Sequence, residues 1–93
     1  MRFEWDEAKA RANLRNHGVS FPEAEKAFDD PKAIVGEDDV HSKHEPRYWL
    51  LGESPKRRLL LVIFTERHGD VTRIITAWKA NREEHELYEN QKK

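Results

Sequence analysis

The sequence contains no cysteine, only four glycines and four prolines among 93 residues, and no long hydrophobic run. The absence of cysteine excludes disulfide scaffolds, thiolate zinc sites and cysteine nucleophiles. Because no apolar stretch approaches the ~20 residues of a membrane span, we expect no transmembrane helix. The first ten residues are too charged for a signal peptide. We therefore expect a cytoplasmic protein that folds as one domain over residues 1–93.

The sequence also has almost no net charge, only −1 at pH 7, but its charged residues are unevenly distributed along the chain. Residues 29–41 have a net charge of −4. Residues 42–82 carry nine lysines and arginines against four acidic residues, a net charge of +5. A basic block of this kind can bind a polyanion. It is equally typical of a salt-bridged surface, so charge alone leaves both interpretations open.

Start and stop signals define two short helices in the first third of the chain. The first is predicted to extend from Glu7 to His17, and Gly18 is suited to end it in the left-handed conformation. Ser20 and Glu23 then form a capping-box pattern at the start of a second helix, which ends before Asp30-Pro31. The pattern predicts a hairpin of two helices.

The remainder of the chain is mostly typical of β-strands. The apolar run of residues 59–64 is suited to a central strand that is buried on both faces. Weaker signals predict strands in residues 2–5, 32–35, 47–51 and 71–79, and a C-terminal helix in residues 80–88. Short turns between consecutive strands require antiparallel pairing. The predicted fold class is α+β, an antiparallel sheet whose helices, two N-terminal and one C-terminal, pack on one face.

Histidines suggest a metal site that the rest of the sequence does not support. His41, His44 and Glu45 have the spacing of metal ligands, and His68 follows in a nearby predicted turn. These residues lie in predicted loops, where such a spacing fixes no common direction for the side chains, and no cysteine is present to complete a ligand set. We therefore favour solvated histidines over a metal site.

Three polar residues form one stripe of the first predicted helix, at intervals of four: Lys9, Asn13 and His17. Such a stripe could bind a ligand. The alternative is that Asn13 and His17 form hydrogen bonds with the backbone of the turn between the two helices, which has polar groups in need of partners. We favour the second interpretation.

Charged residues of the predicted strands include the groups that RNA cleavage requires. Glu45 and Arg47 have the same parity, so both point to one face if both are extended, and Arg67 ends the central strand. A base activates the ribose 2′-hydroxyl, an acid protonates the leaving oxygen, and cations stabilise the phosphorane-like transition state. A charged sheet surface without catalytic function explains the same residues equally well.

The last predicted strand carries further candidate RNA-binding residues. Its alternation places Arg73 and Lys79 on one face, and Thr76 and Trp78 on the other. Trp78, like Trp49, could stack on an unpaired base. Tryptophans of the hydrophobic core would give the same pattern, so the sequence leaves both interpretations open.

Beyond these patterns, the sequence resembles the BrnT family of type II toxins, which are similar in fold to RelE-like ribonucleases. The resemblance extends from Met1 to about Tyr88, and it is most specific in the N-terminal third. The matching residues are Phe3, Trp5, Asp6, Lys9 and Asn13, residues 17–21 with Glu23 and Ala24, Phe28, Asp30 and Pro31, His41, Ser42, Glu45 and Arg47, Gly52, residues 73–77, and Ala80, Glu84 and Tyr88.

The resemblance implies a cytoplasmic bacterial toxin that cleaves RNA without a metal or other cofactor and inhibits translation. It also implies a cognate BrnA-like antitoxin that neutralises the toxin and represses the operon, so that the toxin reaches operator DNA only through the antitoxin, and no membrane is involved. By motif position, His41, Glu45 and Arg47 are candidate catalytic residues. Arg73 and Thr76 lie in the matched last strand.

One departure from the family pattern leaves two functions open. The family usually ends the last strand with Ser-Ala-Arg, whereas this chain has Thr76-Ala77-Trp78, followed by Lys79. If Lys79 supplies the missing charge, it is a fourth catalytic residue, with Arg67, Arg73, Thr76 and Trp78 as RNA-binding residues. If it does not, the chain is a weakened or inactive interaction module that binds an antitoxin and modulates operon repression.

Overall fold

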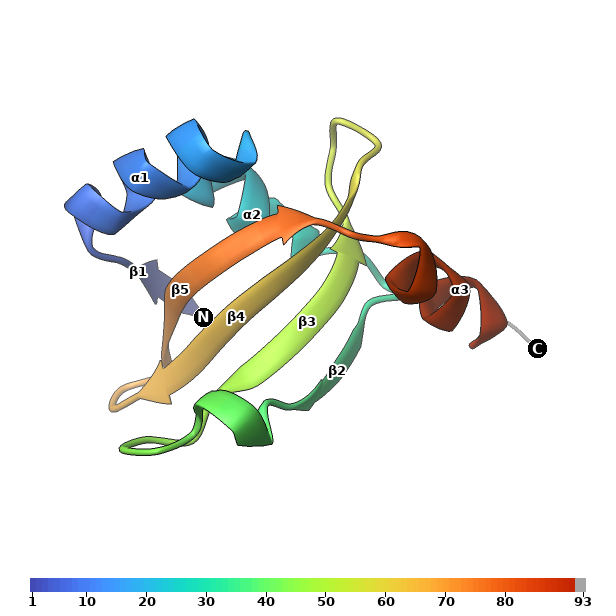
Figure 1. The fold of residues 1–93 in the computed structure, drawn as a ribbon. Helices are drawn as coiled ribbons and strands as arrows, with labels where there is room; N and C mark the ends of the chain where they lie inside the picture. The colour runs from blue at the N-terminus through green and yellow to red at the C-terminus, as the bar shows by residue number, and fades with distance from the viewer. Residues whose placement is uncertain (92–93) are drawn as a thin grey trace.

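Three helices and one five-stranded sheet make up residues 1–91, the part of the chain that the computed structural model describes, apart from the side chain of His41 (Figure 1). Among these residues, no helix is long and apolar enough to cross a membrane. The predicted α+β class is confirmed. The strands are β1 (Arg2–Glu4), β2 (Ile34–Glu37), β3 (Tyr48–Glu53), β4 (Leu59–Arg67) and β5 (Val71–Lys79), the helices are α1 (Glu7–His17), α2 (Phe21–Ala27) and α3 (Arg82–Asn90), and a short 3-10 helix, η1, spans Asp39–His41.

Local capping interactions begin and end the N-terminal helices where the sequence predicts them. The Ser20 hydroxyl accepts a hydrogen bond from the N–H of Glu23 (3.1 Å), and Pro22 lies in the first turn of α2, where its missing N–H costs nothing. Gly18 follows α1 with a φ of 70°, a conformation that residues with a Cβ atom resist. Both predicted helices are therefore confirmed.

The sheet has the strand order β1-β5-β4-β3-β2, and one of its pairings differs from the prediction. The pairs β2–β3, β3–β4 and β4–β5 are antiparallel, as predicted for strands that follow one another in the chain. The N-terminal strand β1, however, runs parallel to β5, with Arg2 opposite Val71 and Glu4 opposite Arg73. The sheet is therefore mixed, because nearly the whole chain separates β1 from β5 and no short turn constrains their relative direction.

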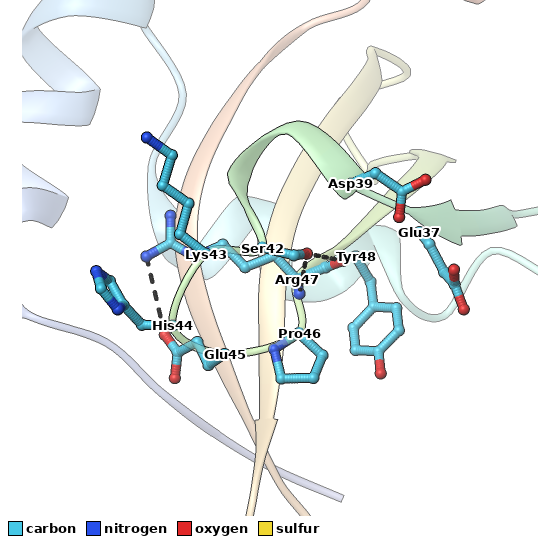
Figure 2. Close-up of a pocket in the computed structure, with 9 residues that line it drawn as sticks. All are labelled: Glu37, Asp39, Ser42, Lys43, His44, Glu45, Pro46, Arg47 and Tyr48. Atoms are coloured by element: carbon cyan, nitrogen blue, oxygen red, sulfur yellow. Dashed lines mark hydrogen bonds and ion pairs between the residues drawn. The ribbon is translucent and has the colours of Figure 1, made fainter.

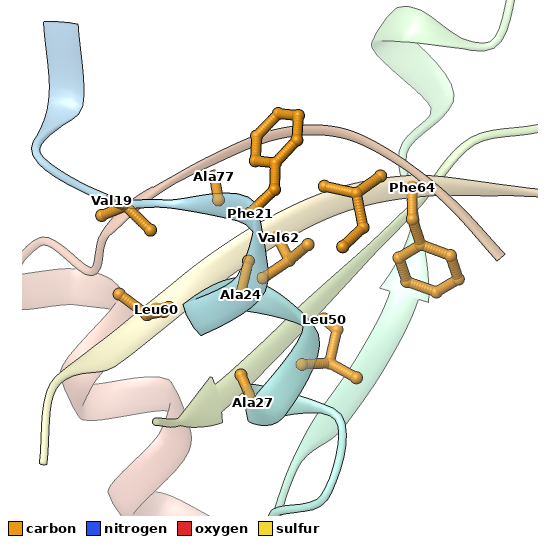
Figure 3. Packing of buried hydrophobic residues seen from close by; sticks show 10 residues of the cluster. Val19, Phe21, Ala24, Ala27, Leu50, Leu60, Val62, Phe64 and Ala77 are labelled. Carbon is orange, nitrogen blue, oxygen red and sulfur yellow. The ribbon is translucent and has the colours of Figure 1, made fainter. Parts of the chain in front are cut away.

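The helix hairpin covers one face of the sheet. Figure 3 shows α2 packed over the sheet, with Ala24 and Ala27 near Val62 and Leu50, and with Phe21 of the same cluster at the start of the helix. All five side chains are buried. We call this side of the sheet the hairpin face. It contains the larger of the two hydrophobic clusters and holds α1 and α2 in place.

The C-terminal helix packs against the opposite face, not beside the other two helices as predicted. Tyr88 of α3 is buried with Leu51, Leu61 and Ile63, whose side chains alternate with those of the hairpin face. Because the central strands are apolar on both sides, the second face also needs a cover. The Tyr88 hydroxyl donates a hydrogen bond to Asp30 (2.6 Å), and burial, together with this carboxylate, raises the pKa of Tyr88 and keeps the phenol protonated.

A β-bulge interrupts the pairing of β4 and β5. Ile63 lies opposite Thr76, but its neighbour Phe64 lies opposite Ile74, so Ile75 is an extra residue in β5. One inserted residue reverses the alternation of every side chain beyond it. The faces predicted for the last strand from parity alone are therefore wrong on one side of Ile75.

The bulge places Arg73 and Lys79 on opposite faces of the sheet. Lys79 lies opposite Leu60, a residue of the hairpin-face core, whereas Arg73 lies opposite Thr65, which belongs to the second face. Trp78 packs with the second-face cluster. Arg73 and Trp78, which parity assigned to different faces, therefore share the second face, and Lys79 does not.

The amide of Asn13 closes the open edge of β5 beyond the end of β1. Its Nδ2 donates to the carbonyl oxygens of Ala77 (2.8 Å) and Val19 (2.9 Å), and its Oδ1 accepts from the N–H of Ala77 (3.1 Å) and the hydroxyl of Thr76 (2.8 Å). The hydrogen bond to Val19 confirms the predicted role of Asn13 in the interhelical turn. His17 lies instead beside the ring of Trp78, at 6.3 Å between centroids.

A buried ion pair attaches α2 to the turn between β3 and β4. The carboxylate of Glu23, with only 4% of its side chain exposed, accepts hydrogen bonds from Arg58 and from the Ser54 hydroxyl (2.7 Å). The Arg58 guanidinium holds the pKa of Glu23 below its usual value. Since Arg58 also donates to the carbonyl oxygen of Gly18 (3.0 Å), it joins both ends of the interhelical turn to the sheet.

Replacing Asn13 by alanine should destabilise the fold by about 2–4 kcal/mol, because it leaves the buried N–H and C=O of Ala77 without their partners, and each costs roughly 1–3 kcal/mol. Asn16→Ala is the matched control, since Asn16 is exposed on the same helix. Urea denaturation of both variants measures the difference. Equal unfolding midpoints for the two variants would contradict the role given to Asn13.

Candidate active site

The connection between β2 and β3 folds back on itself around one serine. The hydroxyl of Ser42 accepts a hydrogen bond from the N–H of Arg47 (2.9 Å) and donates to the carbonyl oxygen of Asp38 (2.6 Å), while the N–H of Asp38 donates to the carbonyl oxygen of Arg47 (2.8 Å). These bonds join the two ends of the connection (Figure 2). This predicted loop is therefore a compact unit that contains η1.

Glu45 lies between two arginines on the second face of the sheet. Its carboxylate is 3.8 Å from the guanidinium of Arg47 and 3.5 Å from that of Arg67. The loop is held on β4 by a hydrogen bond from the Thr65 hydroxyl to the carbonyl oxygen of Pro46 (2.6 Å). We call Glu45, Arg47 and Arg67 the Glu45 cluster. Its three residues were all predicted from the sequence as site residues.

Arg47 has a buried donor that no described residue satisfies. Its Nε is buried without a hydrogen-bond partner, whereas just under a third of the side chain as a whole is exposed. An unpaired buried donor costs roughly 1–3 kcal/mol. A guanidinium is suited to phosphate, to which it can donate two parallel hydrogen bonds, and the side chain of Arg47 is partly exposed. The accessible part of the Arg47 guanidinium, and not its enclosed Nε, is therefore suited to receive an anionic oxygen.

A surface pocket of about 430 Å³ adjoins the cluster (Figure 2). Glu45 and Arg47 line it together with Lys43, His44 and Tyr48. Sequence reasoning missed Lys43 and treated His44 only as a metal ligand, because both fall at unmatched positions between Ser42 and Glu45. Among the described side chains, which do not include that of His41, the structure contains no group of three or more His, Asp or Glu residues that could hold a metal ion.

The backbone of His41 lies in η1, between Asp39 and Ser42, both of which line the same pocket. The side chain of His41 is outside the described part of the chain, so its role stays a prediction. Arg73 lies on the strand next to Thr65 and forms an ion pair with Glu4 (2.9 Å). It shares a face with the Glu45 cluster but has a partner of its own.

The remaining predicted residues do not join this cluster. Trp78 lies opposite Leu61, four residues and about 13 Å along β4 from Thr65. Lys79 is farther along and faces the hairpin side, so the structure does not bring it together with Arg47. The hydroxyl of Thr76 donates to Asn13. The bulge and the length of β5 separate these residues from the cluster.

Comparison with known proteins identifies the family. Residues 5–84 match the family described as the ribonuclease toxin BrnT of the type II toxin-antitoxin system. The chain belongs to the BrnT toxin family. The crystal structure of the ribonuclease toxin BrnT of Brucella abortus has the same fold, with a TM-score of 0.69 and 24% sequence identity over 88% of this chain and 99% of that chain. A comparison with curated proteins finds no match.

Family membership identifies the general activity of the BrnT chain. BrnT proteins are ribonuclease toxins of type II toxin-antitoxin systems, so an RNA substrate and an antitoxin partner follow from the family. The resemblance drawn from the sequence is therefore confirmed. The Glu45 cluster lies inside the matched residues 5–84, and it contains the cations and the carboxylate that an RNA phosphate and a ribose hydroxyl require.

Truncation of Arg47 should weaken RNA binding and flatten its salt dependence. Each phosphate contact contributes about −0.7 to the slope of log K against log salt for single strands, so the slope of Arg47→Ala should be smaller by about this amount. Arg11→Ala, which removes an exposed arginine from α1, is the control. Fluorescence anisotropy with a 2′-O-methyl RNA, which lacks the attacking hydroxyl, measures binding without cleavage. The same slope for Arg47→Ala as for the wild type would show that Arg47 does not contact phosphate.

Proposed function

We propose that this BrnT-family chain is a metal-independent endoribonuclease whose catalytic centre is the Glu45 cluster together with His41. The observation that carries the proposal is the Glu45 cluster itself, in which the Glu45 carboxylate lies 3.8 Å from the guanidinium of Arg47 and 3.5 Å from that of Arg67. A carboxylate beside two guanidinium groups places a proton acceptor next to the charges that a phosphate requires.

The proposed reaction is attack of the ribose 2′-oxygen on the neighbouring phosphorus. Glu45 accepts the proton of the 2′-hydroxyl, the 2′-oxygen forms its bond to phosphorus, and the bond from phosphorus to the 5′-oxygen breaks. His41 donates a proton to the departing 5′-oxygen, which leaves a cyclic phosphate and a free 5′-hydroxyl. Arg47 and Arg67 stabilise the additional negative charge of the transition state, and no step needs a metal ion.

The proposed cellular role follows from the family. The chain would act in the cytoplasm, where RNA cleavage inhibits translation. A BrnA-like antitoxin would neutralise it and carry it to operator DNA, which the toxin itself does not contact.

A second candidate function is supported by Trp78, which stands where the family resemblance expects an arginine. In this interpretation the chain is a weakened or inactive member of the family that binds its antitoxin and modulates operon repression. Trp78 packs with the apolar cluster of the second face, away from the Glu45 cluster. This position favours a structural or binding role for Trp78 and leaves the proposed catalytic residues unaffected.

Excess EDTA should leave RNA cleavage by the purified toxin unchanged. Glu45→Gln should reduce the rate about 10²–10⁴-fold, because the amide cannot accept the proton. The control is Glu25→Gln, which changes an acidic residue of α2 in the same way. Loss of cleavage in EDTA, followed by recovery when a divalent ion is added, would exclude the metal-independent mechanism.

Trp78→Arg should change the cleavage rate by less than about tenfold, and Lys79→Ala should have no effect, since neither residue belongs to the Glu45 cluster. A missing catalytic cation would be worth about 10²–10³-fold in rate. A gain of that size in Trp78→Arg, in a variant shown to be folded by circular dichroism, would instead support the weakened module. A folded wild type and Trp78→Arg that both fail to cleave RNA would support the inactive module.

A further inference from the structure

A second pocket, of about 340 Å³, lies on the second face of the sheet where α3 approaches it. Its lining is mostly apolar and comes from Trp49, Leu61, Ile63, Trp78 and Leu87. We call it the tryptophan groove. Leu87 is half exposed, although the other large apolar residue of α3, Tyr88, is buried. The groove is therefore an apolar surface that the chain itself only partly covers.

The wall of the groove is held rigidly at Trp49. The indole of Trp49 lies against Gly36 in the neighbouring strand, and a Cβ atom at Gly36 would collide with the ring. This packing fixes Trp49 by its contact with backbone, so that its exposed side stays available. A rigid aromatic surface binds an apolar side chain with little loss of side-chain entropy, which is typical of the anchor sites of protein interfaces.

The charged groups at the groove are all acidic. Asp38 and Glu84 line it, and no lysine or arginine does so among the described residues. The helix α3, which forms one side, carries four glutamates against one arginine, and this arginine is within 3.7 Å of Glu86. The opposite end of the same sheet face carries Arg47 and Arg67. The second face therefore carries arginines at one end, where they pair with Glu45, and only acidic charges around the apolar groove at the other end.

This division argues against RNA and against a second copy of the chain as the occupant. Phosphate groups would be repelled by the carboxylates, and the groove offers them no cation. A second copy that docked through its own α3 would bring like charges together, which costs free energy at an interface. A basic protein segment with an apolar anchor matches both the charge and the surface.

We propose that the tryptophan groove binds an apolar side chain of the antitoxin, flanked in the antitoxin sequence by lysine or arginine. The inference rests on the proposed function, because the partner is the antitoxin of this toxin. The groove and the Glu45 cluster share one sheet face, and Leu61 and Arg67 are six residues, or about 20 Å, apart along β4. A short extended segment of an antitoxin anchored in the groove could therefore reach the Glu45 cluster.

The test uses the whole toxin and the purified antitoxin encoded beside it. Leu87→Lys should weaken binding at least about 30-fold in isothermal titration calorimetry, the range of an interface hot spot. Leu87→Glu should lose less affinity, because its charge is opposite to that of the partner, and the difference should shrink in high salt. Leu14→Lys is the matched control, since Leu14 is exposed to a similar degree on α1. It should bind within about threefold of the wild type.

RNA cleavage, measured on the same variants, separates this inference from the proposed function. Normal cleavage by folded Leu87→Lys, with lost antitoxin affinity, would support the inference. Unchanged antitoxin binding by Leu87→Lys would overturn it, as would a greater loss in Leu87→Glu, which would indicate an acidic partner. Loss of RNA binding with antitoxin binding retained would assign the groove to RNA instead. A wild type that binds antitoxin through Leu87 but cleaves no RNA would refute only the proposed endoribonuclease.

Discussion

The β-bulge at Ile75 is the constraint on which the functional surface depends. Without the bulge, the alternation of β5 would place Arg73 and Trp78 on different faces of the sheet, and Lys79 on the same face as Arg73. With it, Arg73 and Trp78 share the second face, while Lys79 turns to the hairpin face. Bulges redirect side chains next to functional sites in many proteins, and here one inserted residue decides which side chains can act together.

The second face reconciles a nearly neutral chain with an anionic substrate. Its basic end gathers Arg47, Arg67 and Arg73, and its other end carries acidic residues around an apolar groove. The charges cancel in the total of −1 but not on the surface. Since exposed charges act mainly within a Debye length of about 10 Å, the two ends can attract different partners.

The hairpin face provides the stability that this surface needs. A chain of 93 residues can build only a modest core, so the hydrogen bonds of its buried polar groups on this side matter for stability. Asn13 satisfies the open edge of β5, and Glu23 with Arg58 joins the interhelical turn to the sheet. These contacts connect the N-terminal motif of the family to the strands that carry the site, which gives the motif a structural role.

Local signals determined the helices and strands, because caps, glycines and apolar periodicity act within a few residues. Gly18 ends α1 and Ser20 begins α2 where predicted, and residues 71–79 form the predicted last strand. The sequence also predicted Glu45, Arg47 and Arg67 as site residues, since they follow the family pattern and the strand ends. Only the tertiary structure decided the parallel pairing of β1, the face covered by α3 and the separation of Lys79 from Arg47. Pairing between distant segments and the register shift at Ile75 depend on packing across the whole sheet, which no local pattern encodes.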